Sequence, residues 1–301
     1  MSRTARPSPA QWLEGARPRT LPAAAAPVIA ASGLAAWVGD FSPVRALLAL
    51  VVALALQVGV NYANDYSDGI RGTDAERVGP MRLVGSGVAR PATVKRAAFA
   101  GFGLAGLAGL GLVLLTGQWW LLAVGAGCVV AAWYYTGGKN PYGYRGLGEV
   151  FVFVFFGLVA VCGTYYVQVG RVSLAALLSG AWVGALACAI LVANNLRDLD
   201  GDRAVGKRTL ATRLGDRGTR ILYVSLVRGS ALLVVVVALL TSGWALAGLA
   251  GLVLLLPASR RVLQGASRGD LVGVLKATGL AELAAAVGFA LGLTLSATGL
   301  V

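Results

Sequence analysis

Apolar runs near twenty residues long recur from one end of this 301-residue chain to the other. As an α-helix, each run is long enough to cross a hydrocarbon core about 30 Å thick. A helix also satisfies its own backbone hydrogen bonds, as a lipid environment requires. Charged residues make up only 13% of the chain, roughly half of their share in soluble domains. The chain is therefore predicted to be an all-α, polytopic membrane bundle, folded as a single domain over residues 1–301.

The apolar runs predict about nine transmembrane helices. The expected spans lie near residues 20–38, 45–65, 97–116, 118–136, 148–168, 174–197, 219–241, 243–257 and 278–298. Short and long connections alternate, and the long ones, with the N-terminal segment, hold 23 of the 26 basic residues. Lys and Arg are enriched in cytoplasmic loops. The N-terminus and the long loops are therefore predicted to face the cytoplasm.

This distribution also explains the net charge of +13 without a nucleic-acid partner. The basic residues stand between apolar spans, whereas a nucleic-acid-binding protein gathers them on one face. The lipid bilayer is the expected partner of these charges. Histidine is absent, so catalytic bases and metal ligands must come from other residue types. Small residues inside the spans are predicted to allow close helix packing, among them Gly103, Gly106, Gly109, Gly125 and Gly127.

Acidic residues gather in two short segments, each at the cytoplasmic end of a predicted span. Residues 61–74 and 194–202 hold six of the thirteen acids: Asp65, Asp68, Asp74, Asp198, Asp200 and Asp202. In the first segment, Asn61, Asp65 and Asp68 share one helical face through i, i+4, i+7 spacing. Both segments place Asn first, then spaced acids, then basic residues. This weak internal repeat predicts two related halves around a central cavity.

Stacked acids repel one another unless a cation lies between them, and Mg²⁺ is the natural cation for them. It prefers hard oxygen ligands and typically bridges carboxylates to substrate phosphates. The neighbouring Arg71, Lys139 and Lys207 could neutralise further phosphate charge. The simpler alternative is that the acids pair with nearby Arg and Lys at the headgroup level. A secondary transporter is a different functional class, but its charges tend to lie near the bilayer midplane.

The double acidic motif resembles that of the UbiA-type superfamily of intramembrane prenyltransferases. Residues 194–202 match its NxxxDxxxD pattern in full, whereas the first segment has Gly at position 69 and continues with Asp68 and Asp74. The resemblance implies nine helices, Mg²⁺ and an isoprenyl diphosphate substrate. It implies Mg²⁺ ligation by Asp65, Asp68, Asp198 and Asp202, and diphosphate contacts from Asn61, Asn194, Arg71 and Lys207. Tyr135 and Lys139 match the superfamily's YxxxK pattern, which implies contacts near the allylic carbon and the diphosphate.

Residues 16–22, 135–149 and 206–215 are similar to the branch of that superfamily that prenylates 1,4-dihydroxy-2-naphthoate on the way to menaquinone. The branch implies loss of CO₂, a demethylmenaquinone product and a bacterial cell membrane. Other acceptors, such as 4-hydroxybenzoate, homogentisate or a sugar phosphate, remain alternatives. Prenyl length and oligomeric state are not predicted.

Residues around the two motifs are candidates for further roles. Arg145 is the candidate partner of the acceptor's carboxylate, with a positive-inside charge as the alternative. A long prenyl tail predicts a cavity that opens laterally to lipid. Arg228 and Glu282, within or near spans, are expected to pair with each other or to snorkel. Aromatic faces can shield an allylic cation from water, and the candidates are Tyr62, Trp133, Tyr134, Tyr142 and Phe151, with Tyr142 also expected near the acceptor.

Overall fold

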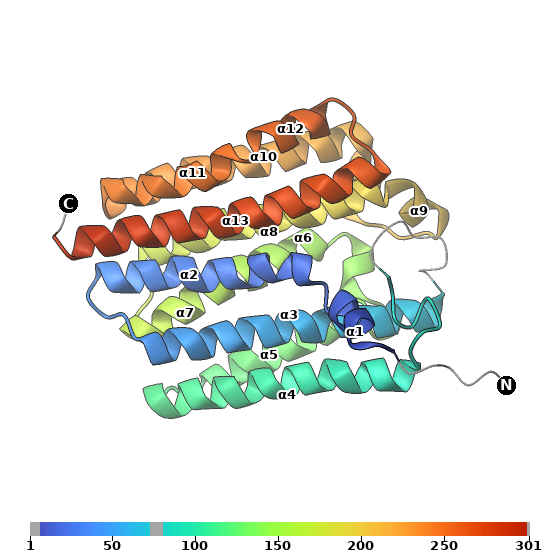
Figure 1. Ribbon diagram of the computed structural model, residues 1–301, viewed down its shortest axis with the longest axis horizontal. Helices are drawn as coiled ribbons and strands as arrows, with labels where there is room; N and C mark the ends of the chain where they lie inside the picture. The colour runs from blue at the N-terminus through green and yellow to red at the C-terminus, as the bar shows by residue number, and fades with distance from the viewer. Residues whose placement is uncertain (1–6, 73–80, 300–301) are drawn as a thin grey trace.

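The computed structural model describes residues 7–72 and 81–299, and all regular elements in this part of the chain are helical. The long helices lie side by side along one common direction (Figure 1). Seven helical segments of the described chain are long and apolar enough to cross a membrane, and a bent helix pair makes an eighth. The prediction of an all-helical polytopic bundle is confirmed.

The seven long segments follow the predicted spans closely in the middle of the chain and extend beyond them elsewhere. The first is a broken run over Pro9–Trp37, made of α1 (Pro9–Gly15), η1 (Pro18–Thr20) and α2 (Leu21–Trp37). The others are α3 (Pro43–Arg71), α4 (Pro91–Thr116), the continuous run α6 (Gly148–Val152), η3 (Phe153–Val159) and α7 (Ala160–Val169), then α8 (Leu174–Arg197), α10 (Leu210–Leu240) and α13 (Arg268–Ala297). Two short elements, η2 (Tyr142–Arg145) and α9 (Leu199–Ala204), lie in the connections.

Two predicted spans differ from a straight transmembrane helix. The helix α5 (Leu121–Tyr134) has only 14 residues, so it rises about 21 Å, less than the roughly 30 Å of a hydrocarbon core. The span expected at 243–257 is bent. Its first arm consists of η4 (Gly243–Ala247) and α11 (Gly248–Val253), its second arm is α12 (Leu256–Leu263), and the two arms meet at 46°. Pro257 stands in the first turn of α12, where its missing N–H costs nothing.

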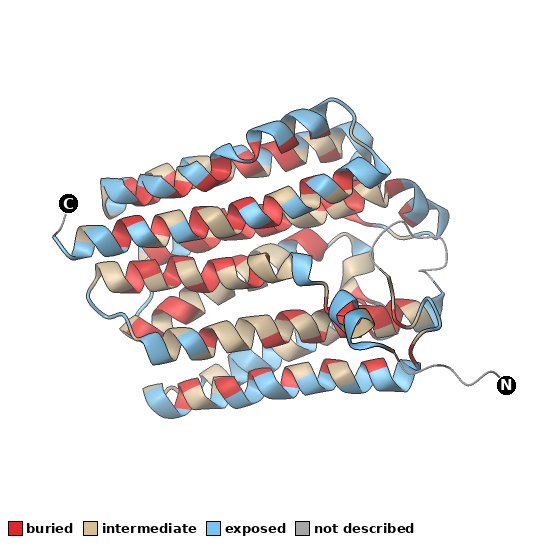
Figure 2. Cartoon of the chain, in the orientation of Figure 1, coloured by how far each residue is buried: buried red, intermediate tan, exposed pale blue. Residues whose placement is uncertain are grey.

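The main core lies between α2, α8, α10 and α13, whose inward faces are buried (Figure 2). Large side chains fill it, among them Trp182, Tyr223 and Phe289, each fully buried. Glycines bring α8 against η3: a Cβ added at Gly157 would lie 2.4 Å from the Gly180 carbonyl oxygen, and one at Gly184 would lie 2.9 Å from that of Phe153.

The glycines expected to pack helices are not the ones that do so. A Cβ at Gly103, Gly106, Gly125 or Gly127 would meet no described atom within 4 Å, and one at Gly109 would only reach Val52 at 4.0 Å. These glycines of α4 and α5 border a cavity or the outer surface. The prediction that they pack helices together is wrong. A residue without a side chain can leave space for a cavity, and it can also let two helices approach closely.

The ends of the helices place the two acidic segments together. The first lies at the end of α3, and the second spans the junction of α8 and α9. Both are at the same end of the bundle, on the right of Figure 1. This agrees with the expectation that both face one side of the membrane.

Candidate active site

Tyr144 connects the two acidic segments in space, although it lies 76 residues after Asp68 and 58 residues before Asp202 in the sequence. Its hydroxyl donates a hydrogen bond to Asp68 Oδ1 at 2.5 Å. Lys207 Nζ lies 4.5 Å from the centre of the Tyr144 ring and 3.6 Å from Asp202 Oδ1. A continuous chain of contacts therefore runs from Asp68 in the first segment to Asp202 in the second. The two segments belong to one site.

Asp65 holds the chain that follows the first segment. Its Oδ2 accepts a hydrogen bond from the Leu83 amide at 2.7 Å, and its Oδ1 accepts one from the Val84 amide at 3.0 Å. The residue is 1% exposed. The same stretch of chain brings Arg82 to 3.7 Å from Asp68 Oδ2. Asp65 thus positions residues 81–84 against the end of α3, a role beyond the metal ligation that the resemblance implies for it.

The second segment carries its own cation. Arg197 donates two hydrogen bonds to the Asp198 carboxylate, from Nε to Oδ1 at 2.7 Å and from Nη2 to Oδ2 at 2.8 Å. The same Nη2 also donates to Asn194 Oδ1. Asp200 is exposed. Asn195, the residue after Asn194, donates a side-chain hydrogen bond to Glu149 Oε1 at 2.9 Å. This bond joins α8 to the buried start of α6.

The predicted cations take different places around the site. Arg71 donates to the carbonyl oxygens of Thr136 and Gly138 and lies 5.6 Å from the Tyr144 ring. It therefore holds the turn that follows α5. Lys139, in the same turn, is exposed. Asp74 lies outside the described residues.

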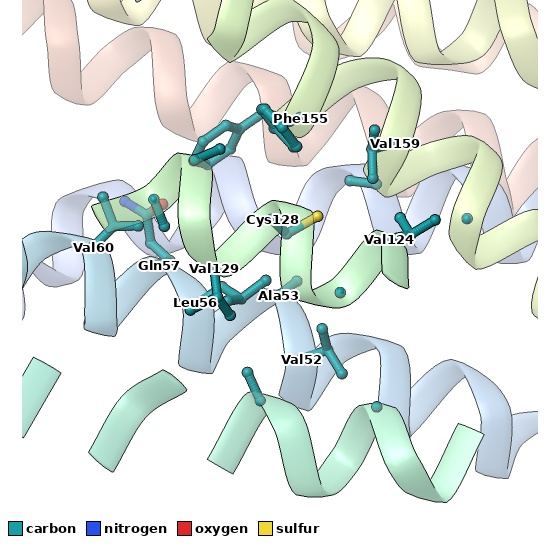
Figure 3. A pocket seen from close by; sticks show the side chains of 18 of the residues that line it. Val52, Ala53, Leu56, Gln57, Val60, Val124, Cys128, Val129, Phe155 and Val159 are labelled. Carbon is teal, nitrogen blue, oxygen red and sulfur yellow. The ribbon is translucent and has the colours of Figure 1, made fainter. Parts of the chain in front are cut away.

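A cavity of about 730 Å³ begins beside this polar cluster and runs into the bundle. Along α3 its lining extends from Asn64 to Ala49, a depth of about 22 Å at the helical rise per residue. Gln57, Asn61 and Asn64 supply amides at the polar end. The remainder is almost wholly apolar: α3 side chains face those of α5, such as Val124 and Cys128, with Phe155 and Val159 beside them (Figure 3). Such a shape suits a ligand with a charged head and a long apolar tail.

The wall nearest the amides is aromatic. The Tyr142 and Phe151 rings stack with centroids 3.9 Å apart, and Tyr135 meets Tyr142 edge-on at 5.5 Å. The Tyr142 hydroxyl donates to the Ala131 carbonyl oxygen at 2.7 Å. Burial raises the pKa of Tyr142, so its phenol stays protonated. All three rings line the cavity, as expected for Tyr135, Tyr142 and Phe151.

The other aromatic candidates are placed elsewhere. Tyr62 donates to the Trp12 carbonyl oxygen and packs edge-on against that ring. Trp133 stacks on Tyr66, and Tyr134 is exposed. None of Tyr62, Trp133 and Tyr134 lines the cavity. These three are packing or interfacial residues, the alternative reading of aromatic side chains at membrane boundaries.

Arg145 and the pair Arg228–Glu282 also depart from expectation. Arg145 does not line the large cavity; it lines a second cavity of about 500 Å³ beside Tyr144. The expected pairing of Arg228 with Glu282 is wrong: Arg228 is exposed, whereas Glu282 is fully buried in α13 and both its carboxylate oxygens lack hydrogen-bond partners in the described structure.

Four site residues were missed at the level of sequence: Asn64, Tyr144, Glu149 and Asn195. The two asparagines lie inside the acidic segments. Asn64 is three residues after Asn61, and Asn195 directly follows Asn194, so both could have been found from the sequence. Asn64 lines the cavity and accepts from the Thr136 hydroxyl at 2.7 Å. Tyr144 and Glu149 lie in residues 135–149, where no spacing rule separates them from their neighbours.

The described residues suit a divalent cation that is shared with a ligand. In the part of the chain that the structure describes, no three acidic or cysteine side chains converge on one metal-sized site. Asp68, Asp198 and Asp202 lie at the same end of the bundle and each contacts one cationic side chain, so a bound metal would share or replace these contacts. Their oxygen-only donors fit Mg²⁺, which commonly takes one or two carboxylates and completes its shell with phosphates and water.

Comparisons with known proteins agree with this geometry. Residues 24–271 match the UbiA prenyltransferase family. A relative from Mycobacterium leprae, named 1,4-dihydroxy-2-naphthoate octaprenyltransferase, is 54% identical over 95% of this chain and 97% of its own. A relative of the same name from Escherichia coli is 43% identical over 73% of each chain.

Solved structures share the fold at low sequence identity. A UbiA homolog from Aeropyrum pernix, solved in its apo form, is 16% identical, with a TM-score of 0.69 over 91% of this chain and 97% of its own. A homolog from Archaeoglobus fulgidus, bound to DMAPP and Mg²⁺, is 14% identical, with a TM-score of 0.64 over 92% and 99% of the two chains. These similarities establish the helical architecture.

Proposed function

This chain belongs to the UbiA prenyltransferase family, and we propose that it transfers a polyprenyl group from polyprenyl diphosphate to 1,4-dihydroxy-2-naphthoate. The carboxylate leaves as CO₂, and the product is a demethylmenaquinol, the reduced form of demethylmenaquinone. The observation that carries the proposal is the joining of two acidic segments, through Tyr144, at the polar end of a deep apolar cavity. The named relatives support the choice of acceptor.

Asp68, Asp198 and Asp202 would hold Mg²⁺, with Asp65 as a further oxygen donor. Each carboxylate oxygen has two lone pairs, so the backbone contacts of Asp65 leave it acceptor capacity. Bound Mg²⁺ would supply Lewis-acid stabilisation of the charge on the departing diphosphate. Lys207, beside Tyr144, and Lys139 would neutralise the remaining phosphate charge, and Arg71 holds the turn that carries Lys139.

The chain's own residues then separate the polar head of the substrate from its tail. Asn61 and Asn64 mark the boundary, because their amides line the cavity at its polar end. The prenyl tail occupies the apolar length beyond them. Tyr135, Tyr142 and Phe151 present ring faces and edges at this boundary, where they can stabilise positive charge on the allylic carbon and exclude water.

The acceptor's electron-rich ring attacks the allylic carbon through the ring carbon that bears the carboxylate, forming the new C–C bond as the bond to the diphosphate oxygen breaks. The ring regains aromaticity by losing CO₂, whose C–C bonding electrons return to the ring. The Tyr142 hydroxyl donates its proton to a hydrogen bond with the Ala131 carbonyl oxygen. It therefore orients the aromatic wall and does not act as a general base. Arg145 stays a proposal for the acceptor's carboxylate. Its position outside the large cavity requires the acceptor to approach from the Tyr144 side.

The spans and their charges support a bacterial cell membrane location. The N-terminus and both acidic segments would face the cytoplasm, where loops are enriched in Lys and Arg. Polyprenyl diphosphate would reach the cavity from the lipid phase. The α5 helix supports this route, because it lines the cavity and none of its residues is buried.

A substrate panel tests the proposal. Purified protein with a polyprenyl diphosphate, Mg²⁺ and 1,4-dihydroxy-2-naphthoate should release CO₂ and diphosphate in equal amounts. The reaction with 4-hydroxybenzoate serves as the matched acceptor control. Turnover with 4-hydroxybenzoate alone would overturn the acceptor, and full turnover after chelation of divalent cations would overturn the metal-dependent site.

A further inference from the structure

The second cavity, of about 500 Å³, is strongly basic. Its lining consists of Tyr144, Leu147 and three arginines, Arg145, Arg208 and Arg213. The arginines come from two connections more than 60 residues apart in sequence. Two contacts hold these connections together: Arg213 Nη2 donates to the Arg145 carbonyl oxygen at 2.8 Å, and the Arg208 amide donates to that of Tyr144 at 3.1 Å. The three guanidinium groups are thus gathered by the fold.

These charges have no acidic counterpart within the described chain. No carboxylate of residues 7–72 and 81–299 forms an ion pair with Arg145, Arg208 or Arg213. The acids of the two motifs contact other cations, namely Arg82, Arg197 and Lys207. Three like charges around one hollow repel one another, so an anion that enters it is stabilised.

Exposed aliphatic side chains occur in the wall of the hollow and shortly after its lining residues in the sequence. Leu147 in its wall is 42% exposed, and Val150, at the start of α6, is 56% exposed. Leu214, directly after Arg213, is 45% exposed. Exposed aliphatic side chains beside a basic pocket at the cytoplasmic ends of spans match a ligand with an anionic head and acyl chains.

We propose that this cavity binds the phosphate headgroup of an anionic phospholipid, with Leu147, Val150 and Leu214 against its acyl chains. Arg208 and Arg213 bind the phosphate oxygens, as guanidinium groups do in bidentate pairs, whereas Arg145, beside Tyr144 in the same wall, stays available for the acceptor's carboxylate. This site is additional to the prenyl diphosphate site. Tyr144 forms part of the wall between them, since it lines the basic cavity and also donates to Asp68. A bound lipid therefore supports the tyrosine that joins the two acidic segments.

Lipid retention tests the proposal without any turnover. The protein is reconstituted with a mixture of phosphatidylglycerol and phosphatidylcholine, returned to detergent, and analysed by native mass spectrometry for bound lipid. The wild type should retain phosphatidylglycerol in preference to phosphatidylcholine. In the Arg208→Gln/Arg213→Gln double variant its affinity for phosphatidylglycerol should fall roughly thirtyfold, which corresponds to about 1 kcal/mol for each arginine removed.

Two further variants make the result specific. Arg217→Gln removes an exposed arginine four residues after Arg213, beyond the non-helical break at Gly215, that does not line the cavity, so it should retain phosphatidylglycerol like the wild type. Arg208→Gln alone removes a side chain with no hydrogen bond to the described protein, so it should fold normally and show a loss of several fold. Equal loss in the Arg217→Gln control would overturn the proposal, because the effect would then be one of net charge.

Competition distinguishes the possible sources of the phosphate. Inorganic phosphate and geranyl diphosphate are added to the lipid-loaded wild type. Neither should displace phosphatidylglycerol, because neither supplies acyl chains for the apolar side of the cavity. Displacement by geranyl diphosphate, together with a raised KM for it in the double variant, would show that the cavity belongs to the prenyl substrate site, and displacement by inorganic phosphate would show a site for a free anion. Either result overturns the lipid assignment and leaves the proposed prenyl transfer standing.

Discussion

At the scale of single residues, the site depends on what each carboxylate touches. Asp65 and Asp198 occupy equivalent positions in the two motifs, yet their surroundings differ. Asp65 is fully buried and its carboxylate accepts hydrogen bonds from the backbone amides of residues 83 and 84, whereas the Asp198 carboxylate accepts hydrogen bonds from the Arg197 side chain of its own segment. Equal motif positions therefore do not have equal structural roles.

This difference predicts distinct outcomes for two alanine variants. Both Asp65→Ala and Asp198→Ala should lose prenyl transfer by at least about a hundredfold, as expected when charge stabilisation is removed. Asp65→Ala should also lose on the order of 2–4 kcal/mol of stability, because two buried amides lose their acceptor. Thermal unfolding in detergent measures this loss. Asp216→Asn, which alters an acid paired with Arg220 outside the motifs, is the control for both readouts.

Tyr144 gives a second prediction at this scale. Tyr144→Phe keeps the ring beside Lys207 and removes the hydrogen bond to Asp68, so kcat/KM for prenyl diphosphate should fall about tenfold, the value of one hydrogen bond to a charged group. The Mg²⁺ concentration for half-maximal activity should rise, while KM for the acceptor stays constant. Tyr134→Phe, on an exposed neighbouring tyrosine, should change none of these. An unchanged Mg²⁺ dependence in Tyr144→Phe would contradict the positioning role.

Local spacing predicted part of this site and missed the rest for a physical reason. The i, i+4, i+7 pattern placed Asn61, Asp65 and Asp68 on one helical face, and the structure agrees that all three are buried there. Tyr144 could not be found in this way, because its partner lies 76 residues away and only the packing of α3 beside η2 brings them together.

At the scale of helices, glycine position decides how close two elements can approach. In Gly184→Ala, the new methyl group would lie 2.9 Å from the Phe153 carbonyl oxygen and 3.1 Å from the Gly157 Cα. Backbone cannot yield as a flexible side chain can, so the variant should lose about 1–3 kcal/mol. Gly127→Ala, where nothing lies within 4 Å, should be neutral or slightly stabilising. The two thermal midpoints in the same detergent provide the comparison; equal midpoints would exclude a tight contact between α8 and η3.

Helix boundaries were predictable where polarity changes sharply and less so where helices continue beyond the apolar run. Residues 174–197 were predicted in full. The α3 helix was predicted to end near residue 65 and continues to Arg71, because Asp65, Ser67 and Asp68 are polar yet buried, with Asp65 bonded to the amides of residues 83 and 84. Hydropathy detects apolar length, whereas this extension depends on the hydrogen bonds of Asp65.

At the scale of the whole molecule, the cavity sets which prenyl chains are accepted. Gly109 lines its distal part and has open space beside it. Gly109→Leu should therefore shorten the cavity and lower kcat/KM for octaprenyl diphosphate about tenfold, while geranyl diphosphate reacts as before. Gly103→Leu, on the same helix but outside the cavity, is the matched control. If both substrates slow equally in Gly109→Leu, the tail does not occupy this part of the cavity.

The overall architecture was the most predictable property of the chain, and the cavity the least. Long apolar runs and the placement of basic residues suffice for a polytopic bundle, since both follow from the solvent that the helices meet. A cavity is a space between side chains of distant segments. Its glycines were predicted to pack helices. The sequence shows that glycine has no side chain, but it does not show whether a neighbouring helix fills the space beside it.

The division of the acidic residues between α3 and the junction of α8 and α9 bears on biogenesis. Each half of the chain supplies one set of carboxylates. A polypeptide whose second half entered the bilayer upside down would carry its carboxylates on opposite faces of the membrane. Such a misinserted molecule would be inert toward diphosphate esters, so faulty topology would reduce quinone output without releasing uncontrolled allylic cations into the lipid.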